Sequence, residues 1–176
     1  MRSILLAVAP VLILGCSGPL VTFDAQMKGT ATIQGSPLGQ LLGTFPQANG
    51  FTSIDFSNNQ DFKNNNTSRD QVKSMRVTSL SLTITSPNNQ DFRFLDSLEF
   101  AVKANGKEQK VATKTGIASL GLAAPNPTLN LDLIDADLAE YVRSPEFSVV
   151  TSGSGRQPAQ DTQIEIDIRF SVGAGL

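Results

Sequence analysis

The chain contains no histidine, no tryptophan and only one cysteine among its 176 residues. Without histidine, a catalytic triad that relies on an imidazole base cannot be built. The same absence, together with a single cysteine, excludes a tetrahedral zinc site made of Cys and His ligands. One cysteine also cannot form an intramolecular disulfide. These three kinds of chemistry are therefore excluded before any motif is considered.

An excess of charge of one sign is also missing. The 14 Lys and Arg residues nearly balance the 16 Asp and Glu residues, which leaves a formal net charge of −2. Such a chain offers no electrostatic basis for binding nucleic acid. Hydrophobic residues make up 40% and charged residues 17% of the chain, which is typical of a globular protein. We expect one domain, no nucleic-acid partner and no cofactor.

The first residues have the anatomy of a secretory signal. Met1 and Arg2 give a short positive start, and an apolar run follows over residues 4–14. This run is too short to span a bilayer, because a transmembrane helix needs about 20 apolar residues. A charged start, a short apolar run and a small residue are typical of a cleaved signal peptide. We therefore expect the signal peptide to cover residues 1–15.

The residues at the end of this segment are Ile13, Leu14, Gly15 and Cys16. They resemble the lipobox of bacterial lipoproteins, in which an aliphatic and a small residue precede a cysteine. The resemblance covers residues 1–16 only. It implies transfer of a diacylglyceryl group to the sulfur of Cys16, cleavage before Cys16 and acylation of the new amine. The alternative is an ordinary secretory signal followed by an incidental buried cysteine.

The same resemblance implies a place in the cell envelope. In enteric lipoproteins an Asp after the lipidated cysteine favours the inner membrane, so Ser17 favours the outer membrane. Residues 16–19 would be the lipidated cysteine and a short tether, and residues 20–176 a single domain. Four residues reach at most roughly 13–14 Å, so the domain is expected close to the leaflet. The implied partner is the membrane, reached through the lipid on Cys16; a protein or envelope-polymer partner is left open.

Beyond the tether, apolar and polar residues alternate with a period of two. The longest case alternates Ile164, Ile166, Ile168, Phe170 and Val172 with polar residues. It predicts an antiparallel strand with one buried face. The other strands are predicted at residues 22–27, 30–34, 52–56, 79–85, 98–102, 107–113, 129–133 and 147–149.

Turn and cap residues complete the fold prediction. Asn105-Gly106 predicts a tight hairpin, because both positions then take a positive φ. Short helices are predicted at residues 36–43 and from Asp135 or Asp137 to Arg143, each with a capping residue at its start. Residues 57–71 and 152–160 are expected to be loops. The pattern predicts an all-β, immunoglobulin-like antiparallel β-sandwich with one or two short helices. A small barrel is the alternative.

A five-residue repeat is also present. Asn-Asn-Gln-Asp-Phe occurs at residues 58–62 and again at residues 88–92. The two copies could be equivalent ligand-binding loops, or two Asx-turn loops that each return a phenylalanine to the core. We favour the second interpretation, because the surrounding residues do not repeat as a solenoid would require.

The acidic residues Asp132, Asp135 and Asp137 are the candidates for a metal site. Oxygen ligands at close spacing suit Ca²⁺, but the spacing of an EF-hand loop is missing. We favour the alternative that Asp135 or Asp137 caps the short helix, where a carboxylate is stabilised by the helix dipole. We therefore expect no metal.

Other carboxylates give no clear catalytic centre. Glu165 and Asp167 share one face of a predicted strand with Arg169, which indicates a solvated row of charges. We predict no catalytic residue and expect a lipid-anchored, non-enzymatic binding or structural module of the envelope. The alternatives are a carboxylate-dependent hydrolase of envelope polymers, which needs paired acids in a cleft, and a calcium-dependent adhesion module.

Overall fold

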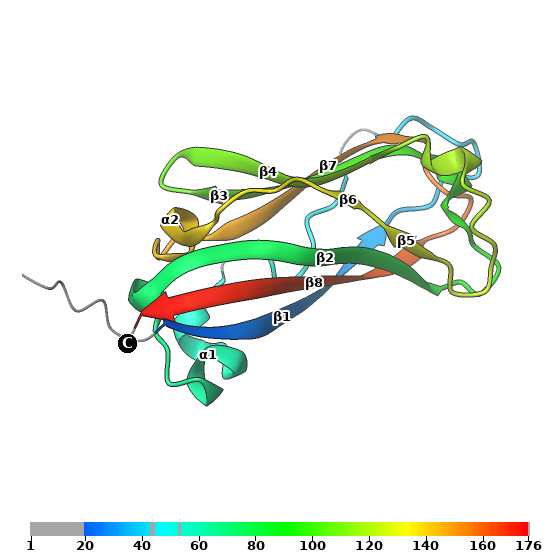
Figure 1. The fold of residues 1–176 in the computed structure, drawn as a ribbon. Helices are drawn as coiled ribbons and strands as arrows, with labels where there is room; N and C mark the ends of the chain where they lie inside the picture. The colour runs from blue at the N-terminus through cyan, green and yellow to red at the C-terminus, as the bar shows by residue number, and fades with distance from the viewer. Residues whose placement is uncertain (1–19, 43–44, 53, 176) are drawn as a thin grey trace, which may run out of the picture.

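The computed structural model describes residues 20–42, 45–52 and 54–175, and these ranges form two four-stranded antiparallel sheets that pack face to face (Figure 1). The first sheet has the order β1-β8-β2-β5, with β1 (Leu20–Ile33), β8 (Thr162–Gly175), β2 (Val72–Ser86) and β5 (Thr128–Asn130). The second has the order β6-β4-β3-β7, with β6 (Asp132–Leu133), β4 (Lys107–Thr115), β3 (Leu95–Ala104) and β7 (Ser148–Gly155). The predicted all-β sandwich is confirmed. Its strand order, with the last strand between β1 and β2, was not predictable from the alternation.

The alternation in β8 sets its orientation as predicted. Ile164, Ile166, Phe170 and Val172 are all fully buried, and Ile168 is 1% exposed. The polar residues between them lie on the outer face of the sheet. Both neighbours of β8 are long strands, so β8 is paired on both of its edges along nearly its whole length.

Truncating one of these side chains is expected to cost far more than truncating its neighbour. Ile168→Ala removes a buried side chain that lies opposite Met27 on β1 and Leu80 on β2, and should lower the free energy of unfolding by about 2–5 kcal/mol. Arg169→Ala changes a side chain on the outer face and should cost under about 0.5 kcal/mol. Urea midpoints of the soluble domain measure both. Equal shifts in the two variants would contradict the assigned register.

Strand β1 is a single strand of 14 residues where the sequence predicted two, at residues 22–27 and 30–34. Gly29, between them, does not interrupt the pairing with β8. Instead it allows another segment to come close: a Cβ on Gly29 would lie 2.7 Å from the carbonyl oxygen of Asn49. Residues Thr30 and Asn49 form a β-bridge there. The glycine therefore marks a close approach of backbones rather than a turn.

One side of the sandwich is closed by the chain between β1 and β2. Along this segment the backbone N–H of Val149 donates to Phe51 O (2.8 Å) and that of Ile54 to Phe147 O (3.0 Å). These hydrogen bonds are made to β7, the edge strand of the second sheet, and to Phe147 just before it. Asn49 donates its backbone N–H to Thr30 O on β1, the edge strand of the first sheet. The strand predicted at 52–56 is absent from the described part of this segment. The backbone hydrogen bonds of this segment are isolated contacts with β1 in one sheet and with β7 in the other, so they do not form the ladder of a strand.

Residues 57–71, predicted to be a loop, contain the helix α1 (Gln60–Asn64) and two 3-10 turns, η1 (Phe56–Asn58) and η2 (Arg69–Gln71). The segment fills the side of the sandwich with phenylalanines. Phe56 and Phe62 are 1% and 0% exposed, and their ring centroids are 5.1 Å apart. Phe62 also meets Phe23 of β1 edge to face, and Phe56 meets Phe147 beside β7. Four aromatic rings thus connect the edges of the two sheets.

Both copies of the five-residue repeat return a phenylalanine to the core, as predicted. The side chain of Asn59 accepts from the backbone N–H groups of Asp61 and Phe62, and Phe62 is fully buried. In the second copy Asp91 accepts from Arg93 N, at the start of the 3-10 turn η3 (Phe92–Phe94), and Phe92 is 1% exposed. The capping residue therefore occupies a different place in each copy.

The strand predicted at 129–133 is divided between the two sheets. Strand β5 pairs with β2, and β6 pairs with β4, so the chain crosses from one sheet to the other between them. Leu129 and Leu131 are buried, but Leu133 is 41% exposed. Leu133 does not share the buried face of Leu129 and Leu131, because the chain has crossed to the other sheet before it.

The helix predicted at 36–43 is wrong for residues 36–42, and residues 43–44 lie outside the described ranges. The backbone N–H groups of Ser36 and Leu42 donate to Pro158 O (2.7 Å) and Gly155 O (3.0 Å), which leaves no helical ladder. Leu38 and Leu41 are consequently 85% and 76% exposed. The predicted loop at 152–160 is also wrong at its start, because β7 continues to Gly155.

Two local predictions are confirmed. Asn105 and Gly106, which join β3 to β4, have φ values of 50° and 71°. The helix predicted near residue 137 is α2 (Ala139–Val142), which is a single turn.

A further 3-10 turn, η4 (Ile117–Ser119), lies at the other end of the sandwich (Figure 1).

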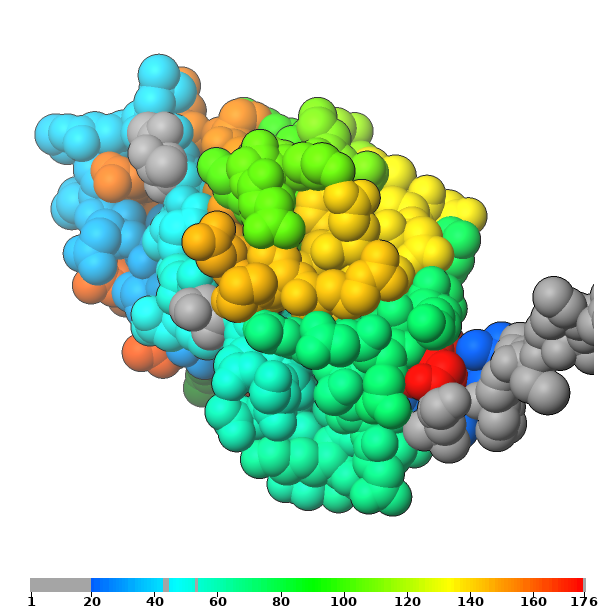
Figure 2. All heavy atoms as spheres, turned by 90° about the vertical axis from the view of Figure 1, so that its left-hand side faces the viewer, coloured from blue at the N-terminus to red at the C-terminus, as the bar shows by residue number. Residues whose placement is uncertain are grey.

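The first and last strands meet at one end of the molecule. Leu20 at the start of β1 lies opposite Gly175 at the end of β8. Figure 2 looks onto this end and shows the two chain segments, blue and red, side by side next to the start of β2. Within the described ranges, no helix is both long enough and apolar enough to cross a membrane.

Candidate functional site

The lipidation residue predicted from the sequence, Cys16, lies outside the described residues, as do the signal peptide and the tether. Leu20, the first residue that the structure places, already belongs to β1 and is 69% exposed. The lipid on Cys16 therefore stays a prediction from the sequence.

The three aspartates considered for a metal site have separate partners. Asp132 forms an ion pair with Lys114 (2.9 Å), and Asp135 forms one with Arg76. Asp137 Oδ1 accepts from the backbone N–H of Ala139 (3.0 Å), at the start of α2, and from Met75 N (3.1 Å). Asp137 therefore bonds the first N–H of α2 from the residue before its N-cap, Leu138. In the part of the chain that the structure describes, no three potential metal ligands come together.

The carboxylates of β8 form a row of charges on the outer face of the first sheet. Lys28 Nζ lies 2.9 Å from Glu165 Oε1, and this hydrogen bond raises the pKa of Lys28 above its ordinary value. Asp167 Oδ2 accepts from the side-chain amide of Gln26 (2.6 Å). The other oxygen of Asp167 is buried without a hydrogen bond and lies 3.9 Å from Arg169 Nε.

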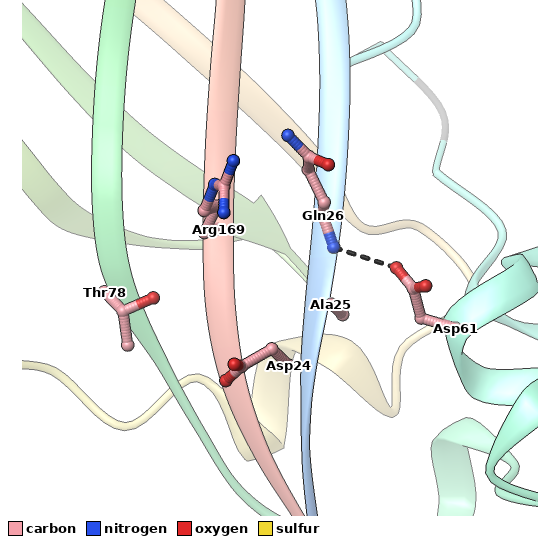
Figure 3. Close-up of a pocket in the computed structure, with 6 residues that line it drawn as sticks. All are labelled: Asp24, Ala25, Gln26, Asp61, Thr78 and Arg169. Atoms are coloured by element: carbon pink, nitrogen blue, oxygen red, sulfur yellow. Dashed lines mark hydrogen bonds between the residues drawn. The ribbon is translucent and has the colours of Figure 1, made fainter.

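A pocket of about 240 Å³ adjoins this row of charges (Figure 3). Its lining comes from three neighbouring strands and one helix, and we call it the β1–β8 pocket. The lining residues are Asp24, Ala25 and Gln26 of β1, Thr78 of β2, Arg169 of β8 and Asp61 of α1.

Strand register explains why these side chains share one surface. Asp24 and Gln26 point outward from β1, on either side of the buried Ala25. Gln26 is the cross-strand partner of Arg169. On the other side of β8, the ladder with β2 shifts register between Val77 and Ser79, which leaves Thr78 unpaired at a bulge.

Helix α1 supplies the last wall. Gln26 lies on the edge strand β1, so its backbone N–H has no strand partner on that side. Asp61 Oδ2 accepts this N–H at 2.9 Å, as the dashed line in Figure 3 shows. The same contact fixes α1 against the sheet and holds the Asp61 carboxylate at the pocket. One hydrogen bond therefore serves both the sheet edge and the site.

The pocket carries two negative groups and one positive group. Among the described residues, neither Asp24 nor Asp61 forms an ion pair, and the ion-pair contact of Arg169 is the 3.9 Å approach to Asp167. In Figure 3 the guanidinium of Arg169 points along β8 and away from Asp24, whose carboxylate reaches across from β1 toward β8. The arrangement offers carboxylate acceptors on either side of β1, from Asp24 and from Asp61, and a planar cationic donor on β8.

Sequence reasoning did not find this pocket. Alternation places Asp24, Gln26 and Arg169 on outer faces, but nothing local shows that the first and last strands are neighbours. Asp61 was assigned to a loop. A signal for the site would have required the pairing of β1 with β8, which is long-range information.

No known protein-family model matches the chain, and no curated protein matches it either. Among solved structures, the BFDV capsid protein matches in its decameric form, with 10% identity, 89% of this chain and 99% of that chain covered, and a TM-score of 0.41. The 60-mer of the BFDV capsid protein matches with 13% identity, coverage of 91% and 95%, and the same TM-score of 0.41. Cocksfoot mottle virus matches with 8% identity, coverage of 100% and 97%, and a TM-score of 0.29. At such scores we draw no functional argument from these likenesses.

Proposed function

We propose that this protein is a lipid-anchored module of the bacterial cell envelope that acts by binding or scaffolding rather than by catalysis. The observation that carries the proposal is the one cysteine of the chain, Cys16, placed directly after Ile13-Leu14-Gly15 at the end of a short apolar run. A chain with a single thiol at that place matches the use of cysteine as a lipid attachment site.

The start of the sandwich supports this proposal. Strand β1 begins at Leu20, so residues 17–19 are the whole tether between Cys16 and the first strand. The lipid would then hold the end of the molecule shown in Figure 2 next to the leaflet. Asp24 lies four residues along β1, roughly 13 Å from its start at about 3.3 Å per residue. The β1–β8 pocket would therefore face sideways, near the membrane but above it.

One observation favours a second candidate, the carboxylate-dependent hydrolase of envelope polymers. Asp24 and Asp61 line the same pocket, and hydrolysis of glycosidic bonds uses two carboxyl groups across one cleft. Incubating the protein with envelope polymers would separate the two candidates. Release of fragments that stops in Asp24→Asn would favour the hydrolase, and no release by the wild type would favour the binding module. The calcium-dependent adhesion module has less support, because its three aspartates have separate partners.

The anchor is tested by the mass of the mature protein. After expression in a Gram-negative host and extraction in detergent, we expect an N-terminus at Cys16 that carries a diacylglyceryl group and an amide-linked acyl chain. Intact-mass and N-terminal peptide measurements check both features. A mature protein with a different N-terminus, or a Cys16 thiol that reacts freely with a maleimide, would contradict the proposal.

A further inference from the structure

The β1–β8 pocket holds opposite charges that do not neutralise one another. Asp24 lies opposite Ser171 on β8, and Arg169 lies opposite Gln26 on β1. The two residues are therefore diagonal neighbours, a spacing of roughly 7–8 Å. Diagonal neighbours with long side chains often pair directly, but the guanidinium of Arg169 points away from Asp24. The pocket between them is left with an anionic and a cationic end.

We propose that the β1–β8 pocket binds a small zwitterion whose ammonium group is separated from its carboxylate by several carbon atoms, as in the side chain and carboxylate of a lysine-type amino acid. The ammonium group would contact the carboxylate of Asp24, and the carboxylate of the ligand would accept from the guanidinium of Arg169. This assigns a ligand class to the binding role proposed above, and it rests on that role.

The chemistry of each wall fits this ligand. Arg169 presents paired N–H donors that match the two oxygens of a carboxylate. Asp61 Oδ2 accepts the backbone N–H of Gln26, which holds this second carboxylate at the opposite side of β1. Asp24, without an ion pair among the described residues, has both of its oxygens available. With two acidic residues and one basic residue, the lining attracts the cationic end of the ligand first.

Size and surface exclude other ligand classes. A volume of about 240 Å³ is below the roughly 300–1,000 Å³ of sites for drug-sized molecules, so the ligand is small. No aromatic ring lines the pocket, and Ala25 is its one apolar residue. A sugar that stacks on a flat ring, or an apolar ligand, would therefore find no matching surface.

The test is an NMR titration of the ¹⁵N-labelled full chain in detergent micelles. The probes are 6-aminohexanoate and L-lysine, with butylamine, hexanoate and glycine as single-charge or short comparisons. We expect saturable shifts of the backbone amides of Gln26 and Thr78, with millimolar dissociation constants for the two long zwitterions. The comparison compounds should bind at least roughly fivefold more weakly, because each loses one charged contact or cannot span both ends.

Variants identify the two ends of the site. Asp24→Asn and Arg169→Gln should each raise the dissociation constant for 6-aminohexanoate by roughly fivefold or more. Asp96→Asn and Arg93→Gln make the same changes of charge at exposed positions outside the pocket, and they should leave binding unchanged. Binding of butylamine as tight as that of 6-aminohexanoate, equal loss in the control variants, or no saturable shift at tens of millimolar would each overturn the proposal.

The outcome of the titration is independent of the anchor. The mass of the mature N-terminus reports lipidation whether or not the pocket binds a zwitterion. A failed titration with a lipidated Cys16 would remove the ligand class and keep the anchor. A successful titration with an unmodified Cys16 would remove the anchor and keep the pocket.

Discussion

Replacing Cys16 by serine is expected to leave the protein unlipidated and its precursor unprocessed, with less of it retained in the membrane fraction than of the wild type. Serine keeps the size of the side chain but has no sulfur to accept the diacylglyceryl group. Each buried methylene of an acyl chain contributes about 0.8 kcal/mol, and one chain alone binds membranes only reversibly. Two or three chains make the attachment effectively permanent, so losing them should move part of the protein from the pellet to the soluble fraction. Fractionation followed by immunoblotting measures this distribution.

The matched control for this variant is Ser17→Ala, which changes the next residue and leaves the sulfur in place. It should keep the protein in the membrane fraction. The serine variant should also keep its signal segment, because cleavage in the lipoprotein route comes after lipidation. Equal membrane retention of the Cys16→Ser variant and the wild type would contradict the lipid-anchor proposal.

Phe62→Ala is expected to be among the most destabilising single changes in the domain. Phe62 is fully buried and touches two other rings, Phe23 of β1 at 5.3 Å and Phe56 at 5.1 Å between centroids. Truncating a buried phenylalanine costs about 3–5 kcal/mol, through lost burial and the cavity that remains. A domain of ordinary stability, about 5–15 kcal/mol, would lose a large part of its margin.

Chemical denaturation of the soluble domain measures the loss. The neighbouring change Lys63→Ala is the control, because Lys63 lies on the same helix with an exposed side chain. It should cost under about 0.5 kcal/mol. If Phe62→Ala cost no more than Lys63→Ala, the ring would not be part of the closure between the two sheets.

The long strands were predictable because burial on one face imposes a period of two. In β8 every second residue is apolar, and a shift of one residue would expose all five inward side chains. The hairpin at Asn105-Gly106 was predictable for a local reason, since few other residue pairs take two positive φ values without cost. Both cases depend on information within a short stretch of chain.

The errors arise where distant segments decide the structure. Residues 36–42 have a helical pattern of leucines, but the N–H groups of Ser36 and Leu42 bond to residues 158 and 155, far along the chain. Gly29 would end a strand on local grounds, but it serves the approach of Asn49. The crossing between β5 and β6 results from the packing of two sheets.

The candidate site was unpredictable for the same reason. Three of the pocket's polar side chains lie on β1 and β8. The fourth polar residue on a strand, Thr78, faces outward only because of a bulge on β2. Asp61 reaches the pocket through a helix that no propensity indicated. A binding surface built from four separate segments has no motif that a single sequence displays.

The position of β8 between β1 and β2 also determines when the protein can fold. The first sheet lacks its central strand until residues 162–175 have been made, so β1 and β2 cannot pair through it during synthesis. Pairing of chain ends this far apart makes folding slow, on the order of milliseconds to seconds for all-β domains. A domain whose first sheet is completed only by β8 stays threadable while that strand is missing, as the proposed place in the cell envelope would require. Truncation after Gly155 would leave β1 without a strand partner and β2 paired only with the short β5, and is expected to prevent folding.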